Sequence, residues 1–305
     1  MDLYVQSRTW IEINEPAFQH NIKQLVRCCG STQLGVVLKA NAYGHGMIPM
    51  ARLAQNHADI AWILVAATHE AIILRKEGIT KPILVLSYHD SDLAEAIMLD
   101  IALVTYCDEM AHKINDAAQK VGKAARVHIK VDTDMSRLGV QPQNITQYIQ
   151  TLRALKSINV EGIFTHFCDT NNLDLSFTVH QQTLFDQIIR AHREFRYVHA
   201  VASGALMLEQ KYDMARIGTN MYGFWKSPVQ KQRFESLWPG MTLRPLLSWK
   251  TKIIQIKHLE AGSTVGYNRS FRAPYHMITA ALPIGFFDGY PRDMSNRGSV
   301  MEKIF

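Results

Sequence analysis

A chain of 305 residues, with 47% hydrophobic and 20% charged positions, is long enough to bury a large core and too long for one minimal domain. The formal net charge of +6 comes from basic residues scattered among acidic ones, which excludes a nucleic-acid partner but is compatible with a small anionic ligand. The four cysteines lack Cys-x-x-Cys spacing, and no segment reaches about 18 continuous apolar residues, so no disulfide framework, metal site or membrane association is expected. These features predict a cytoplasmic protein.

The first segment, residues 1–13, is expected to provide a strand that associates with a β domain formed later in the chain. A helix is predicted directly after it, because Asn14 can cap a helix whose first turn holds Glu15 and Pro16. Apolar residues at helical spacing continue from there to Val26.

Strand-like and helical segments then alternate along most of the chain. Short apolar, β-branched runs occur at 35–42, 61–66, 82–87, 102–107, 126–132, 160–167, 196–203 and 214–223. Segments of helical spacing between them include 93–99, 110–121, 145–155 and 179–194. Strand followed by helix, eight times over, is typical of a closed (β/α)8 barrel, which we place at residues 14–235.

The pattern changes after Gly223. A Trp238-Pro239-Gly240 turn leads into the apolar runs 246–258 and 277–284, which have no helical segment between them. We therefore predict a smaller, mostly β domain at residues 236–305.

The carboxyl ends of the predicted barrel strands carry the chemically interesting residues. The first run holds Lys39 among apolar residues and continues into a polar, glycine-rich loop. The seventh run ends at Ser203, and the eighth carries Arg216 and Gly218. Because barrel enzymes often bind phosphate in the loops after strands seven and eight, backbone amides there and the Ser203 hydroxyl are predicted to hold a phosphate dianion.

Lys39 in apolar surroundings is expected to lose its proton more readily than a surface lysine, which frees the amine to form a Schiff base with an aldehyde. The aldehyde cofactor that also bears a phosphate is pyridoxal 5'-phosphate. A lysine near a strand end is also commonly a solvated or ion-paired residue, and spacing by itself does not separate these interpretations.

The sequence VLKANAYGHG at residues 37–46 resembles the pyridoxal-phosphate attachment motif of the alanine racemase family. Further motifs follow in the order of that family: DTDMSRLG (132–139), THF (165–167), RIG (216–218), MYG (221–223), VGY (265–267) and DGYPR (288–292). The resemblance covers essentially the whole chain. It implies a barrel followed by a β domain, and a head-to-tail homodimer that acts on a small amino acid.

The resemblance also implies roles for single residues. Lys39 is expected to bind the cofactor and to act as one catalytic base, and Tyr267 to act as the other on the opposite face of the substrate carbon. In the family this tyrosine enters the site from the partner subunit. His166 corresponds to a histidine linked to that tyrosine, although an ordinary hydrogen-bonded barrel histidine is the alternative.

Arg216 resembles the arginine that faces the pyridine nitrogen of the cofactor, and His199 is expected to hydrogen-bond to it. Because a guanidinium stays protonated, such an arginine limits electron withdrawal into the ring. Arg137 is expected on the cofactor side of the site, with a part in binding the substrate carboxylate. The positions that match the phosphate-binding residues of the family are Tyr43, Ser203, Gly218 and Thr219.

The chain departs from the family pattern in two places. Phe286 precedes Asp-Gly-Tyr-Pro where the family usually has a tyrosine, which removes a hydroxyl near the substrate and opens the alternative of another small amino acid, such as serine. Family members also continue with further strands beyond the position of Phe305, so the β domain is expected to be incomplete. A natural short form, a piece of a longer protein and a disrupted reading frame all stay open, and the activity is expected to be weakened.

Three functions remain to be compared. The first is alanine racemization, which would supply D-alanine for peptidoglycan. The second is a catalytically weak or non-catalytic pyridoxal-phosphate-binding protein, but the single-barrel proteins of that kind lack the β domain predicted here. The third is decarboxylation of basic amino acids, which Arg216 argues against because such relatives place an acid beside the pyridine nitrogen.

Overall fold

The computed structural model describes residues 7–209 and 212–301, and the chain divides into two compact units. The barrel unit is Asn14–Leu246, and the β unit combines Met1–Ile13 with Leu247–Phe305. The sequence placed the second boundary at 235/236, whereas the structure keeps residues 236–246 with the barrel. The reason is a side-chain clamp: Asn21 donates to the Arg244 carbonyl (2.7 Å) and accepts from the Arg244 amide (2.8 Å).

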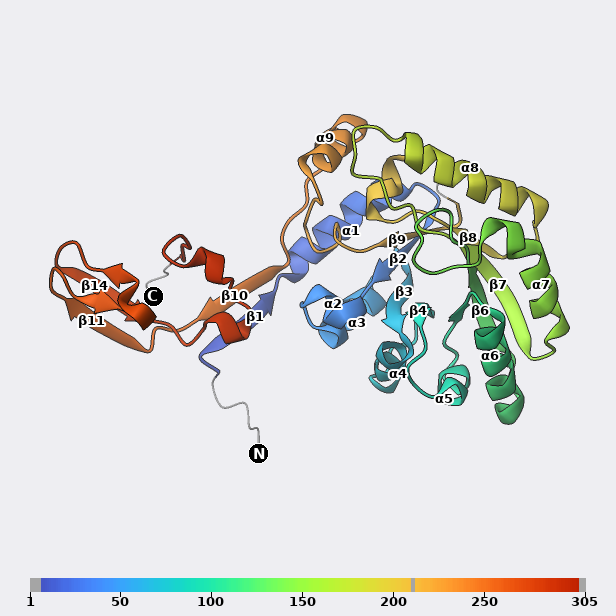
Figure 1. Ribbon diagram of the computed structural model, residues 1–305, viewed down its shortest axis with the longest axis horizontal. Helices are drawn as coiled ribbons and strands as arrows, with labels where there is room; N and C mark the ends of the chain where they lie inside the picture. The colour runs from blue at the N-terminus through green and yellow to red at the C-terminus, as the bar shows by residue number, and fades with distance from the viewer. Residues whose placement is uncertain (1–6, 210–211, 302–305) are drawn as a thin grey trace. The chain divides into compact units, whose positions relative to one another are not determined.

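Parallel strands form the wall of the barrel unit (Figure 1). In chain order they are β2 (Gln33–Val37), β3 (Ile60–Ala67), β4 (Ile83–Tyr88), β5 (Leu103–Thr105), β6 (Ala125–Lys130), β7 (Ile158–Phe164), β8 (Tyr197–His199) and β9 (Met214–Ile217). They pair in the orders β4-β3-β2-β9 and β5-β6-β7-β8. Parallel bridges between Leu84 and Ala102 and between Ala202 and Arg216 join the two groups. This arrangement confirms the predicted (β/α)8 fold class.

Helices follow the strands around the barrel (Figure 1). They are α1 (Glu15–Cys29), α2 (Lys39–Tyr43), α3 (Met47–Asn56), α4 (Thr68–Lys76), α5 (Leu93–Met98), α6 (Asp108–Val121), η1 (Pro142–Asn144), α7 (Ile145–Ala154), α8 (Ser176–Ala191), η2 (Ser203–Met207) and α9 (Pro228–Leu237). The predicted cap of α1 is present, since the Asn14 side chain accepts from the Ala17 amide at 2.9 Å.

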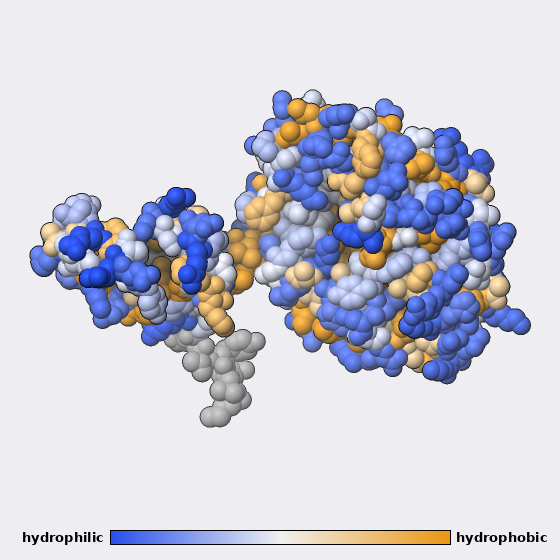
Figure 2. Space-filling view, in the orientation of Figure 1, coloured by the Kyte–Doolittle hydropathy of each residue, from blue (hydrophilic) through white to orange (hydrophobic). Residues whose placement is uncertain are grey.

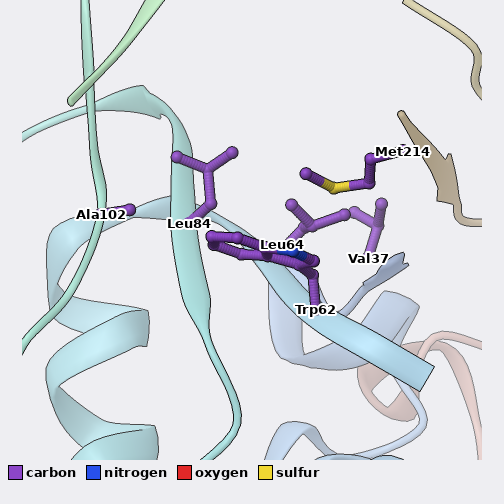
Figure 3. Packing of buried hydrophobic residues seen from close by; sticks show 6 residues of the cluster. All are labelled: Val37, Trp62, Leu64, Leu84, Ala102 and Met214. Carbon is purple, nitrogen blue, oxygen red and sulfur yellow. The ribbon is translucent and has the colours of Figure 1, made fainter. Parts of the chain in front are cut away.

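Apolar side chains from several strands fill part of the barrel interior (Figure 3). This cluster consists of Val37, Trp62, Leu64, Leu84, Ala102 and Met214, each of them buried. Strands β2, β3, β4 and β9 each contribute to this cluster, and Trp62 and Leu64 lie two residues apart on one face of β3, as alternation along a strand requires. A packed interior of this kind fixes the positions of the strand ends that carry the site.

Short antiparallel pairs make up the β unit. Strand β1 (Thr9–Ile13) pairs with β10 (Leu247–Thr251), β11 (Gln255–Leu259) with β14 (Met277–Ala281), and β12 (Thr264–Val265) with β13 (Phe271–Arg272). Single turns of 3-10 helix accompany them: η3 (Tyr267–Arg269), η4 (Phe286–Asp288) and η5 (Arg292–Met294).

A left-handed turn follows β2 directly. The predicted strand at 35–42 is too long, because β2 ends at Val37 and Ala40, Asn41, Ala42 and Tyr43 all have φ between +53° and +55°. Residues with a Cβ are disfavoured in this conformation, so other contacts must hold the turn.

The carboxylate of Glu70 provides such a contact. One oxygen accepts from the Ala40 amide at 2.7 Å, and the other accepts from the Ala66 and Ala67 amides at 2.8 and 3.2 Å. Glu70 is only 6% exposed, so this carboxylate links the left-handed turn to the end of β3 and the start of α4.

The visible face of the barrel unit is mostly hydrophilic, with apolar residues in small separate groups (Figure 2). Within the described residues, no helix is long and apolar enough to cross a membrane.

We predict that Glu70→Ala lowers the free energy of unfolding by about 2 to 3 kcal/mol, because three backbone amides, of which that of Ala67 is buried, lose their acceptor. Urea denaturation measures the change. Glu77→Ala is the matched control, since Glu77 lies at the end of the same helix in an exposed ion pair with Arg52. Glu77→Ala should lower the free energy of unfolding by less than about 0.5 kcal/mol. Equal losses in the two variants would show that the Glu70 contacts do not stabilise the turn.

Candidate active site

A cavity of about 390 Å³ lies at the carboxyl ends of the barrel strands. Eight of the nine site residues predicted from the sequence line or border it: Lys39, Tyr43, Arg137, His166, Ser203, Arg216, Gly218 and Thr219. The ninth, Tyr267, belongs to the β unit, where it begins η3 and is 94% exposed. Phe286, also in the β unit, lies in η4 beneath the Arg292 guanidinium, 4.6 Å from the ring centroid.

Lys39 directly precedes the left-handed turn, and its ammonium lies 5.9 Å from the centroid of the Tyr43 ring. Burial lowers the pKa of Lys39 from its ordinary value, and the charges of Arg137 and Lys226 lower it further, while Glu70 opposes them. The amine is therefore deprotonated more readily than that of a surface lysine, as the sequence predicted.

Arg216 on β9 is 4% exposed, and its guanidinium hydrogen-bonds to residues at the ends of β7 and β8. It donates to the carbonyls of Thr165 (2.7 Å) and Ala200 (3.0 Å) and to Nδ1 of His199 (2.8 Å). A longer contact of 3.4 Å reaches Nδ1 of His166. Burial lowers the pKa of Arg216 to about 9, which leaves it protonated at neutral pH.

Two histidines next to Arg216 form a chain of hydrogen bonds whose donor and acceptor roles follow from the guanidinium. Because a guanidinium only donates, His199 must accept at Nδ1 and carry its proton on Nε2. That Nε2 then donates to Nδ1 of His128 at 2.9 Å. Burial and the Arg216 charge hold the pKa of His199 and His166 well below the usual range, and burial lowers that of His128 to about 3. The expected bond between His199 and Arg216 is thus present, whereas no sequence motif pointed to His128.

The loops after β8 and β9 form a small polar cradle. The Ser203 hydroxyl accepts from the Gly218 amide at 3.0 Å, and a Cβ on Gly218 would lie 2.8 Å from the Tyr43 hydroxyl oxygen. The buried Thr219 hydroxyl has no hydrogen-bond partner among the described residues. A Cβ on Gly204 would overlap the Thr170 hydroxyl. Glycine therefore leaves the space in which an oxygen-rich group fits between these hydroxyls and amides.

Arg137 lies on the loop that follows β6. Asp132 shapes this loop, because its carboxylate accepts from the Met135 and Ser136 amides at 2.9 and 3.0 Å. Gly139 has φ +138°, and a Cβ there would lie 2.4 Å from the Asp132 nitrogen. The motif at 132–139 thus folds into a compact loop that brings the exposed Arg137 to the cavity.

Two lysines were missed by the sequence analysis. Lys130 ends β6 and is 5% exposed, with its ammonium 5.6 Å from the centroid of the Phe164 ring. Burial, followed by the charges of Arg137, Arg216 and Lys39, lowers the pKa of Lys130 to about 8. Lys226 lies before α9 and also lines the cavity. No aspartate or glutamate is among the described residues that line it, so the cavity is strongly cationic and suited to anionic ligands.

Comparison with known proteins identifies the family to which this geometry belongs. The model of the alanine racemase N-terminal domain matches residues 13–225, and that of the C-terminal domain matches residues 246–303. The chain is 36% identical to the alanine racemase of Symbiobacterium thermophilum over 308 residues, which span 99% of this chain and 80% of that protein.

Solved structures agree with this result. An alanine racemase from Clostridium difficile 630 has a TM-score of 0.87 at 32% identity, covering 94% of this chain and 76% of that one. A histidine racemase from Leuconostoc mesenteroides has a TM-score of 0.83 at 25% identity, covering 94% and 77%. With two family models that together match most of its length, and with a relative 36% identical over 99% of it, this chain belongs to the alanine racemase family.

Proposed function

We propose that the protein is a pyridoxal-phosphate-dependent alanine racemase that interconverts L-alanine and D-alanine. The observation that carries this proposal is a single cavity that contains a lysine with a lowered pKa, a buried arginine and a polar cradle for phosphate. The relatives from Symbiobacterium thermophilum and Clostridium difficile, both named alanine racemases, support the choice of alanine.

The residues present fit the cofactor. Its phosphate dianion would lie between Ser203, Gly218 and Tyr43, where Thr219 offers a buried hydroxyl without a partner. The cationic lining stabilises the negative charge of that group. Arg216 and Lys39 would hold the pyridine nitrogen and the aldehyde carbon, respectively. When bound, the cofactor attaches the substrate amine and withdraws electrons from its Cα, which acidifies the Cα proton.

The side chains of the protein supply the catalytic bases and determine the charge around the cofactor. Lys39 is proposed to take the proton from one face of Cα, because burial lowers its pKa and makes the neutral amine, which can act as a base, easier to form than in a surface lysine. Arg216 would donate a hydrogen bond to the ring nitrogen and, because a guanidinium keeps its proton, would not protonate it, which would favour return of the proton to Cα over side reactions. Arg137 is proposed to bind the substrate carboxylate, since it is an exposed cation at the same cavity.

Tyr267 is proposed as the base for the other face of Cα. A tyrosine can act as a base only beside cations that stabilise its phenolate, and the described cavity lining supplies such cations. We propose that the protein forms a homodimer in which Tyr267 reaches the cavity of the partner subunit and approaches His166 there. No nucleic acid or membrane takes part in this assignment.

The accepted side chain is the least constrained feature. Phe286 lacks the hydroxyl that the family usually has at this position, and a histidine racemase is among the structural neighbours. Another small amino acid such as serine is therefore the second candidate substrate. With alanine as substrate, the proposed role is supply of D-alanine for peptidoglycan in the cytoplasm.

We predict that the purified chain with added pyridoxal phosphate forms D-alanine from L-alanine faster than it converts L-serine or L-histidine. Lys39→Ala should reduce the rate at least about a thousandfold, because it removes both a base and the cofactor attachment. Borohydride reduction followed by mass spectrometry should find the cofactor on the peptide that contains Lys39. Lys120→Ala, on the exposed face of α6, is the control that keeps the rate. Cofactor attached elsewhere, or faster turnover of serine, would contradict the assignment.

A second prediction tests the origin of Tyr267. Lys39→Ala and Tyr267→Phe, each nearly inactive alone, should regain about a quarter of the wild-type activity when coexpressed in equal amounts, because half of the dimers are then mixed and each mixed dimer has one intact site. Each variant expressed alone sets the background. Activity that stays at this background in isolated mixed dimers would place Tyr267 in the site of its own subunit.

A further inference from the structure

Lys226 is a cation of the cavity to which no role has been given above. It lies between the loop after β9 and the first residue of α9, and its side chain is exposed at the cavity wall. Within 7–209 and 212–301 no ion pair includes it, in contrast to Lys231 on α9, which pairs with Glu235 at 3.7 Å. The ammonium group of Lys226 is thus available to an anion.

Gln230 fixes the backbone of Lys226 beside the phosphate cradle. The Gln230 side chain is fully buried; its oxygen accepts from the Lys226 amide at 2.8 Å, and its nitrogen donates to the Asn220 side chain at 3.3 Å. A Cβ on Gly204 would lie 3.5 Å from the same nitrogen. The buried Gln230 amide therefore hydrogen-bonds to Lys226 and to the loop after β9, and it lies next to Gly204 in the loop after β8. Lys226 is thus placed beside the two loops that form the cradle.

The start of α9 strengthens this placement. The Ser227 hydroxyl caps the helix by accepting from the Gln230 amide at 3.1 Å, and Trp225 packs edge-on against the buried Phe234 at 5.2 Å. The residues on both sides of Lys226 are therefore anchored, while its side chain stays exposed. Lys226 lines the cavity together with Lys39 and His166, and its charge helps to lower the pKa of both.

We propose that Lys226 is an additional binding residue for the phosphate group of the cofactor, adding a point charge to the neutral donors of Tyr43, Ser203, Gly218 and Thr219. This inference rests on the proposed function. The substrate carboxylate is the other anion in the cavity, but Arg137 serves it from the loop after β6, whereas Lys226 is tied to the loops after β8 and β9.

The test compares two ligands that differ only in the phosphate. Equilibrium dissociation constants for pyridoxal phosphate and pyridoxal are measured spectroscopically on the full chain and on Lys226→Met. The variant should bind pyridoxal phosphate about tenfold more weakly, the size of one charge-assisted contact, and pyridoxal nearly as the wild type does. Because any change in Lys39 affects both ligands alike, the ratio of the two constants isolates the phosphate. Added salt should reduce the difference, since a charge at the cavity mouth is screened.

Lys231→Met removes a charge from α9 outside the cavity and should leave both dissociation constants unchanged. Lys226→Arg keeps the charge and should retain most of the affinity for pyridoxal phosphate. Equal weakening for both ligands, no weakening, or a rise confined to the KM for alanine would overturn the proposal. A wild-type chain that binds pyridoxal phosphate no better than pyridoxal, or that binds neither, would instead reject the cofactor assignment and this inference with it.

Discussion

The site is organised around a guanidinium that is buried without a carboxylate. Burial of a charge is costly unless the group is hydrogen-bonded, and the Arg216 guanidinium donates to two carbonyls and an imidazole nitrogen at the ends of β7 and β8. This forces His199 to be a neutral acceptor, which in turn orients His128. The ends of three strands are thereby held in one arrangement at the cavity.

The described cavity lining contains no aspartate or glutamate, so the charge of Arg216 is not neutralised by an acid there. A carboxylate beside Arg216 would compensate its charge and would also compete with the anionic groups of a ligand. Among the described residues, Glu70 is the one carboxylate whose charge raises the pKa of Lys39, and its oxygens are occupied by backbone amides. The positive charges of Lys130, Arg137, Arg216 and Lys226 therefore remain available for phosphate and carboxylate, and those of Arg137 and Lys226 lower the pKa of Lys39 as well.

The sequence predicted those parts of the fold that depend on local patterns. Strand and helix periodicity predicted the barrel, and the Asn14 cap predicted the start of α1. The end of β2 was misplaced because the apolar residues after Lys39 imitate a strand, while the turn is held by Glu70, thirty positions away. Lys130 and Lys226 were missed for a similar reason: only the closed barrel brings the ends of β6 and the start of α9 to the position of Lys39. Tyr267 was found through its motif, and its contribution to the cavity remains a proposal.

The most direct test of this account is the protonation state of His199, measured by nitrogen NMR on histidine-labelled protein between about pH 5.5 and 8. Because the Arg216 charge and burial lower its pKa well below the ordinary value, the folded protein should keep His199 neutral over this range, with the proton on Nε2 and none on Nδ1. His199→Asn identifies the signal. An imidazolium that forms near pH 6.5, or a proton on Nδ1, would contradict the claim that the buried arginine determines the charge and orientation of its neighbours.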